Sequence, residues 1–331
     1  MCSSRYTRNM TIIGYLHECC VYFCSCNKEL NSLVQYNVWP ATPTKPLTAV
    51  SMELLFTFIA LQLEGKISLL SFCDALSCKS GILDHQLVSR LQYCVCESNK
   101  NGSLFYCMDA NFGLVLKKSS SKSKKMPIRS EQLFVADTEV VNLMEKYDDS
   151  SGETRKDCSN FQAGNNIRSK RKTNKLSVTG VFGMSCRHEY SKLFLNMCHG
   201  ERLGYAVMLL DKILQESNGK ELNVHIVYDI ACVLKRHLEK KQTMTKYNHF
   251  NFGIPLFPSY GHNVNCQIKN SIRRLESFGL MDGELMERLW SYLRSFSKIT
   301  KEMTPAHRMD LLGDALMHFG SIKMGNIGIH R

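Results

Sequence analysis

The chain has 331 residues, 44% of them hydrophobic and 22% charged, with a formal charge of +12. These values are ordinary for a folded protein of one large or two smaller domains, and they exclude a chain too polar to bury a core. A basic excess favours polyanionic partners such as nucleic acid, because Lys and Arg that neutralise phosphates release condensed counterions. The same charge is equally compatible with a solvated basic surface that has no partner.

The fifteen cysteines do not indicate a secreted disulfide scaffold. Such scaffolds are short and follow a signal peptide, and the N-terminus here lacks an apolar core with a small-residue cleavage site. The most apolar stretch, Thr48 to Leu63, contains Glu53 and is shorter than the roughly 20 apolar residues that span a bilayer. We therefore expect intracellular, reduced cysteines and no membrane partner.

Residues 1–45 form a cysteine-rich N-terminal segment that ends in WPATPTKP. Three prolines in this octapeptide predict an extended, irregular path. Residues 46–100 follow as a helical lead-in, because Leu54, Leu55, Phe58 and Leu61 recur at helical spacing.

The predicted core covers residues 101–320 and begins with SLFYCMDANFGLVL, from Ser103 to Leu116. Its apolar runs flank Ala110 and Asn111, which predicts two tightly joined strands with Asp109 ending the first. Residues 117–175 are a flexible basic insertion: KKSSSKSKK (117–125) and RSKRKTNK (168–175) suit a nuclear localisation signal or the DNA backbone. A solvated loop explains these runs equally well, and the protein would then be cytoplasmic.

The elements after the insertion alternate between strands and helices. We predict a strand at 176–185, a helix at 201–216, a strand at 221–229 that ends in Asp229, and a helix directly after it. A last helix, from about 283 to 298, carries Glu284 and Glu287, and 321–331 is a tail.

Acids that end neighbouring strands, with a third on a facing helix, suit phosphodiester chemistry. Two Mg²⁺ or Mn²⁺ ions about 3.5–4 Å apart can activate the attacking oxygen and stabilise the leaving one. Mg²⁺ takes oxygen ligands, commonly a few carboxylates and the substrate phosphate. Singly, each acid is weak evidence, because an Asp after a strand is more often a turn residue or a helix cap.

Several long motifs resemble the Kyakuja-Dileera-Zisupton (KDZ) transposases. They include DANFGL, CRHEY, GERLGY, YDIAC, and the segment from FPSYGHNVNC to GELMERLWS, while FCSC and LVQYNVWPATPTKP resemble the lead of that family. The resemblance spans roughly 20–116 and 176–316. It implies an α/β, ribonuclease-H-like (retroviral integrase-like) mixed sheet with flanking helices, behind a helical, cysteine-rich lead.

Carried over to this chain, the resemblance implies that Asp109, Asp229 and Glu287 are catalytic and bind two Mg²⁺ or Mn²⁺ ions. ERLWS, with Glu287, is also similar to a catalytic glutamate motif of the hAT transposases. Glu284 is the alternative third acid, since residues three apart share a helix face. Ordinary helix charge, such as Glu284 with Arg288, is the competing interpretation of the pair.

Two further sets of residues are candidates for binding. Cys186-x-His188 and His262-x₃-Cys266 flank Asp229 and have the ligand types of a structural zinc site, although separate buried roles are open. Basic residues on and beyond the last helix are candidates for DNA phosphates, with a solvated face as the equal alternative: Arg288, Arg294, Lys298, Lys301 and Arg308. Trp290 is expected in the core.

The implied function is a DNA transposase that cleaves and joins strands of a mobile element. Double-stranded DNA, both element ends and target, is then the partner, and the active form is expected to be a homo-oligomer in the nucleus. A catalytically inactive, host-adopted DNA-binding or interaction protein, and a stand-alone nuclease of the same fold, remain alternatives. The chain ends soon after RMDLL, which suggests a truncated copy.

Overall fold

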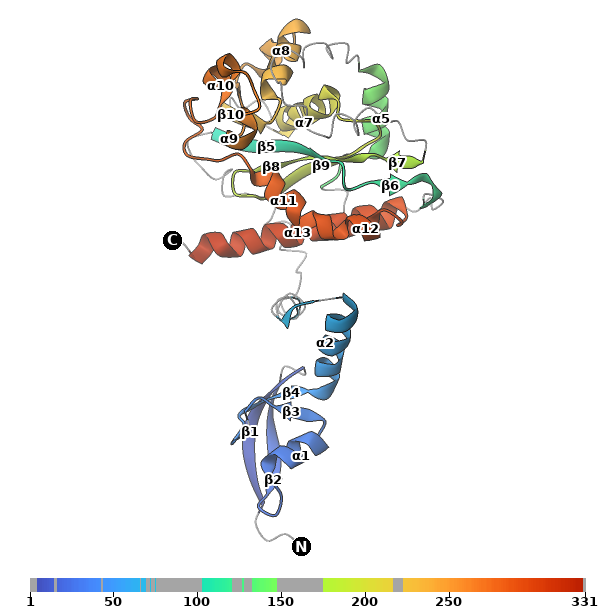
Figure 1. Cartoon of the computed structure of the whole chain (residues 1–331), viewed down its shortest axis with the longest axis vertical. Helices are drawn as coiled ribbons and strands as arrows, with labels where there is room; N and C mark the ends of the chain where they lie inside the picture. The colour runs from blue at the N-terminus through green and yellow to red at the C-terminus, as the bar shows by residue number, and fades with distance from the viewer. Residues whose placement is uncertain are drawn as a thin grey trace. The chain divides into compact units, whose positions relative to one another are not determined.

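The computed structural model describes residues 5–14, 17–42, 44–65, 103–120, 133–147, 175–216 and 223–329, with isolated positions at 67–69, 72, 75 and 127. The chain divides into two compact units, Met1–His85 and Gln86–Arg331. Figure 1 shows both, and each is described by itself.

The first unit is a four-stranded sheet with two helices. Strand order is β2-β1-β4-β3, in which β1 is antiparallel to β2 and parallel to β4. The elements are β1 (Arg5–Ile13), β2 (His17–Cys24), α1 (Glu29–Gln35), β3 (Val38–Pro40), β4 (Thr48–Ser51) and α2 (Met52–Gly65). Our expectation of an irregular path through the prolines misses β3, which pairs antiparallel with β4.

A small core and a bidentate ion pair hold this unit together. Met10, Phe23, Leu33 and Ala49 are among its buried residues, and Arg8 donates to both carboxylate oxygens of Glu29 at 2.7 and 2.8 Å. Such a two-point pair fixes α1 against β1 more firmly than a single contact would.

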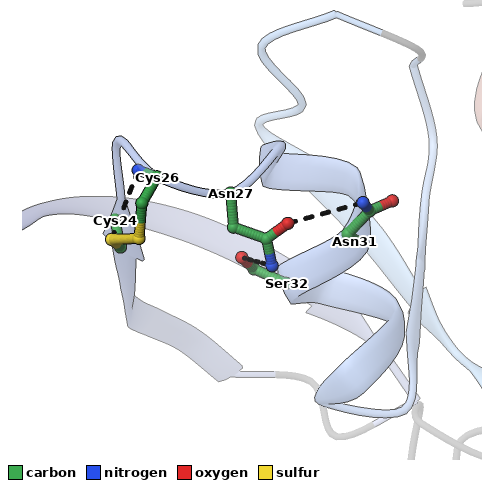
Figure 2. The surroundings of a disulfide bond; sticks show 5 residues. All are labelled: Cys24, Cys26, Asn27, Asn31 and Ser32. Carbon is green, nitrogen blue, oxygen red and sulfur yellow. Dashed lines mark hydrogen bonds between the residues drawn. A yellow bond between two sulfur atoms is a disulfide. The ribbon is translucent and has the colours of Figure 1, made fainter. Parts of the chain in front are cut away.

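Cys24 and Cys26 form a disulfide at the end of β2, with their Cα atoms 5.4 Å apart. Figure 2 shows this bond, and beside it Asn27, which accepts from Asn31 and donates to Ser32 at the start of α1. Our expectation of reduced cysteines is therefore wrong for this pair. The CxC spacing lets the backbone turn bring the two sulfurs together, because that Cα separation is within the usual disulfide range.

The second unit is built on a mixed five-stranded sheet of order β11-β10-β5-β8-β9. β10 is parallel to both β5 and β11, whereas β8 is antiparallel to β5 and to β9. The strands are β5 (Ser103–Asn111), β8 (Gly180–Cys186), β9 (Ser191–Met197), β10 (Asn223–Tyr228) and β11 (Phe250–Gly253), and a separate pair joins β6 (Leu116–Lys117) to β7 (Leu176–Val178).

Helices cover both faces of this sheet, as Figure 1 shows. On one side lie α5 (Asp137–Lys146), α7 (Leu203–Glu216) and α8 (Ala231–Lys240), which share a core with Tyr106, Met108, Ile226 and Tyr228. On the other lie α11 (Leu285–Leu293) and α13 (Pro305–Ile329), which pack on Phe105, Cys107 and Val227. The shorter elements are η1 (Lys118–Ser120), η3 (Met244–Tyr247), α9 (Leu256–Ser259), α10 (Val264–Asn270), η4 (Arg294–Phe296) and α12 (Ser297–Thr300).

The two cores follow directly from the alternation of side chains along a strand. Successive residues of β5 and β10 point to opposite faces, so each apolar run supplies both cores. This explains why the sequence of β5 reads as a continuous apolar run rather than as an alternating one.

Four element predictions need correction. The tight hairpin expected at Ala110–Asn111 is absent: β5 continues to Asn111, and β6 pairs with β7 instead. The strand β9 was missed altogether. The expected tail at 321–331 continues α13 as far as Ile329, and the expected 283–298 helix ends at Leu293 before a 3₁₀ turn.

The basic insertion is described only in part. Within it lies α5, whose first turn carries Asp137 and Glu139 and whose Val140 and Met144 are buried. Most of the two basic runs, and residues 148–174 between them, lie outside the described residues. Among the described helices, none is long and apolar enough to cross a bilayer.

Candidate active site

Strand pairing places Asp109 and Asp229 side by side. The parallel register of β5 and β10 pairs Met108 with Tyr228, so the next step along both strands sets Asp109 beside Asp229. Paired residues on adjacent strands share a sheet face about 5 Å apart. The register therefore gives two carboxylates, 120 positions apart in the chain (229 − 109), one common location at the edge of the sheet.

Helix α11 adds a third acid to this location. Leu285, Leu289 and Leu293 bury one face of α11 against the sheet, and Trp290 lies in the same core. The indole Nε1–H of Trp290 donates to Oδ2 of Asp109 at 2.9 Å. Glu287, one turn before Trp290, shares its helix face and lies close enough to raise the pKa of Asp109. Trp290 is thus a core residue, as expected, and also a direct partner of Asp109.

The start of α11 is fixed by Gly283 and Glu284. Gly283 has a φ of +84°, which side chains rarely adopt, and an added Cβ would lie 2.9 Å from Cβ of Pro255. Glu284 accepts a hydrogen bond from the backbone N–H of Phe257 at 3.1 Å. Glu284 therefore ties α9 to α11, and it also shares a side-chain hydrogen bond with Glu287.

A fourth acid, Glu201, also reaches this edge of the sheet. It follows β9, which runs parallel to β5 because both are antiparallel to β8. The hydroxyl of Tyr228, the residue before Asp229, donates to the carboxylate of Glu201. The negative charge of Glu201 contributes to the raised pKa of Asp109.

The electrostatics of the site are those of crowded like charges. Burial, followed by repulsion from Asp229, Glu287 and Glu201, raises the pKa of Asp109 well above its usual value. Burial of its carboxyl and repulsion from Glu284 raise the pKa of Glu287 to about 7, although its side chain reaches solvent. Burial also raises the pKa of Glu284. A site that disfavours its own negative charge in this way is suited to cations.

The carboxylates are neighbours, but they are not drawn tightly together. In the described ranges, the acids are not part of any group of three or more His, Cys, Asp or Glu side chains whose ligand atoms all lie within 4.8 Å of one another. Mutual repulsion and the indole contact to Asp109 both oppose closer approach. Two ions would in any case spread their ligands over a wider site than one ion would.

The tight group instead contains Cys232, His262 and Cys266, all buried. His262 and Cys266 belong to our predicted zinc set, whereas Cys232 does not. Cys186 and His188 are not in this group: Cys186 is buried at the end of β8 beside Tyr190, and His188 lies in the turn that follows.

The candidate DNA-binding residues have different environments. Arg294 and Lys298 are exposed and Lys301 is half-buried. Arg288 is paired with Glu189 and with Asp282, so its guanidinium is already bound to two carboxylates. These contacts displace the alternative pairing with Glu284.

The prediction that Arg308 binds DNA is wrong, because its side chain is fully buried and unable to reach a phosphate. Its guanidinium donates to Oδ1 of Asn196 at 2.6 Å and to the carbonyl of Leu114 at 2.8 Å. Asn196 in turn donates to Asp137. Burial lowers the pKa of Arg308 to about 10. Arg308 is a structural cation that joins α13 to β9.

The sequence matches the family described as Kyakuja-Dileera-Zisupton transposase over residues 102–319. That match covers most of the chain. This protein belongs to the KDZ transposase family. Residues 1–84 also match a CxC2-like cysteine cluster associated with KDZ transposases, in agreement with the resemblance of the N-terminal segment. No curated protein and no solved structure matches the chain.

Two residues of this KDZ chain escaped our sequence reasoning. Glu201 lies within GERLGY, and the missing signal was β9: once SKLFLNM is recognised as a strand, Glu201 becomes another acid that follows a strand. Cys232 lies in the first turn of the helix predicted directly after Asp229, but the sequence pattern does not show that His262 and Cys266 meet it.

Proposed function

We propose that this chain is the catalytic part of a metal-dependent DNA transposase with a ribonuclease-H-like fold. The sheet order supports the fold, because three strands in an antiparallel meander followed by two strands parallel to the first is the arrangement expected of it. The parallel register that sets Asp109 beside Asp229 is the observation that carries the proposal.

The residues present fit divalent cations such as Mg²⁺ or Mn²⁺. Asp109, Asp229 and Glu287 offer carboxylate oxygens, the ligand type that these ions take, and burial followed by repulsion between neighbouring acids raises the pKa values of Asp109 and Glu287. Bound ions would activate an attacking oxygen and stabilise the leaving oxygen of a phosphodiester. Glu284 is the alternative third ligand.

The protein's own side chains have positioning roles in this proposal. Trp290 donates to one oxygen of Asp109, and the backbone of Ala110 also hydrogen-bonds this carboxyl, so its orientation is fixed. Tyr228 donates to Glu201, which lies at the same edge and is a further carboxylate available to ligands or to water. Fixed carboxylates need no rearrangement when the phosphodiester arrives.

DNA is the partner that family membership implies, and its form and cellular place belong to the proposal. We infer double-stranded element ends and target DNA, a homo-oligomer in the active state, and a nuclear location. Arg294, Lys298 and Lys301 are the remaining candidates for backbone phosphates. Zinc, the second metal class that we expect, has its best-supported place at Cys232, His262 and Cys266.

The proposal is tested by strand cleavage and joining on DNA carrying the element's own ends, with Mn²⁺ or Mg²⁺. Asp109→Ala and Asp229→Ala should each lower cleavage at least about 10³-fold, because loss of a metal ligand removes several kcal/mol of transition-state stabilisation. DNA binding by both variants should remain. A wild-type chain that binds DNA but never nicks it would instead favour a host-adopted binding protein.

A further inference from the structure

The group formed by Cys232, His262 and Cys266 has the geometry of metal ligands. Nδ1 of His262 lies 3.7 Å from Sγ of Cys232 and 3.5 Å from Sγ of Cys266. A tetrahedral zinc ion with Zn–N of about 2.0–2.1 Å and Zn–S of about 2.3 Å separates its N and S ligands by about 3.5–3.6 Å. The two observed separations are therefore close to the edge lengths of a zinc tetrahedron.

Two segments far apart in the sequence bring these ligands together. Cys232 is in the first turn of α8, His262 precedes α10, and Cys266 is in α10. Asn263 caps α10 by accepting from the N–H of Cys266 at 2.8 Å, which fixes the His262-x₃-Cys266 turn. All three ligands are buried, so an ion held there would be shielded from bulk water. Three protein ligands leave one tetrahedral position for a water molecule.

Partners around the ligands resemble those found around metal sites. The second ring nitrogen of His262, Nε2, lies 3.1 Å from the backbone carbonyl of Asp229, and this acceptor requires the proton on Nε2. Nδ1 then has a lone pair that faces the two sulfurs. Metal-ligating His residues characteristically donate their other N–H to a carbonyl or carboxylate in this manner. The side-chain amide of Asn270 also donates to Sγ of Cys266 at 3.3 Å.

We propose that Cys232, His262 and Cys266 bind one Zn²⁺, and that this ion holds the backbone of Asp229 in place through His262. The second half of the proposal rests on the proposed function of Asp229. The ion would join α8 and α10 at the base of the strand end that carries this acid. The side chain of Asp229 would then lie at the cleavage site, while its backbone carbonyl is held by the zinc-bound His262.

The first test is the zinc content of the purified full chain, measured by elemental analysis. Cys232→Ser and Cys266→Ser should each lose about one equivalent relative to wild type, whatever zinc the N-terminal unit carries. Cys198→Ser is the matched control, because Cys198 is also a thiol of this unit and lies outside the group. Unchanged zinc in both ligand variants, or an equal loss in Cys186→Ser, would overturn the site.

A wild-type measurement protects this test against variants that fail to fold. Thiol alkylation mapped by mass spectrometry should show Cys232 and Cys266 protected together with zinc and modified together after chelation. Cys107 and Cys198 should keep the same modification rate in both states. If chelation leaves the reactivity of Cys232 and Cys266 unchanged, the thiols only hydrogen-bond to His262 and hold no ion.

The link to Asp229 is tested with two His262 variants. His262→Gln removes the Nδ1 ligand but retains an N–H near the Asp229 carbonyl, whereas His262→Ala removes both. Both should lose the zinc. The Mn²⁺ concentration for half-maximal cleavage should rise about 10–100-fold in His262→Ala and less in His262→Gln, as is usual for partners of a ligand. Loss of zinc without any change in Mn²⁺ dependence would refute the link while leaving the zinc site intact.

Discussion

Two regions of the second unit arrange charged side chains in opposite ways. Arg308 is fully buried, yet Asn196 and the Leu114 carbonyl accept from it, and Asp137 lies next along the network. At the edge of the sheet, Asp109, Asp229, Glu287 and Glu201 lie near one another, and burial together with these like charges raises the pKa of Asp109 well above its usual value.

The comparison separates structural charge from functional charge. Arg308 is fully buried and its two terminal nitrogens donate to fixed acceptors, so it contributes to one fold and cannot reach a ligand in solvent. Acids that repel one another cost stability, so their persistence at one edge is better explained by a ligand that neutralises them. The same reasoning assigns Arg288, with two carboxylate partners, to structure rather than to DNA.

The largest effect that sharpens this comparison is expected for Glu287. Glu287→Gln should lower strand cleavage at least about 10³-fold, because it removes a proposed metal ligand. Glu284→Gln should lower it only about 10-fold, since its amide oxygen still accepts from Phe257. Single-turnover cleavage in Mn²⁺ measures both. If Glu284→Gln is the more damaging change, Glu284 is the third ligand.

The next largest effect, on the free energy of unfolding, is expected for the buried Arg308. Arg308→Met should lower the free energy of unfolding by about 3 kcal/mol, because two buried acceptors lose their donor. Urea denaturation measures the change, with His307→Ala at the exposed neighbouring position as the control. Unchanged stability together with weaker DNA binding would return Arg308 to the DNA-binding set.

The acidic cluster also predicts an effect of pH on the chelated protein. The pKa of Glu287 rises to about 7 in the folded chain, so its contribution to stability is present below about pH 4.5 and is lost as the pH rises through 7. The loss should be about 1 kcal/mol or less, because solvent screens this exposed side chain.

Thermal unfolding in EDTA between pH 4.5 and pH 7.5 measures this loss. Mn²⁺ should restore stability most at the higher pH, where protons no longer compete for the carboxylates. Glu287→Gln should flatten the pH dependence. A stability that rises over this range in EDTA would show that the carboxylates are not a repulsive cluster.

The smallest effect concerns the exposed basic residues after α11. Arg294→Ala and Lys298→Ala should each weaken DNA binding a few-fold and reduce the slope of log affinity against log salt by about 0.9 for each lost phosphate contact. Binding at several salt concentrations measures the slope. Lys240→Ala, exposed on α8 across the sheet, is the matched control and should change neither quantity.

Local patterns were enough to predict much of the core. The apolar run before Asp229 predicted β10, and the stripe of Leu203, Val207, Leu210 and Leu214 predicted α7. They failed where the pattern was weak or mixed. β9 has the short sequence SKLFLNM, and its sheet position depends on pairing with β8. The helical pattern around ERLWS also placed Glu287 on a helix. That pattern could not show that Glu284 accepts a hydrogen bond from Phe257 in α9.

The sequence by itself determined the family and its motifs, and the acids and thiols that they contain. Only the tertiary structure decided which of these residues meet. Strand register set Asp109 beside Asp229, α8 and α10 joined Cys232 to His262 in place of Cys186 and His188, and α13 buried Arg308. The physical reason is that spacing along the chain fixes neighbours within one helix or strand, whereas contacts between elements depend on how their apolar faces pack.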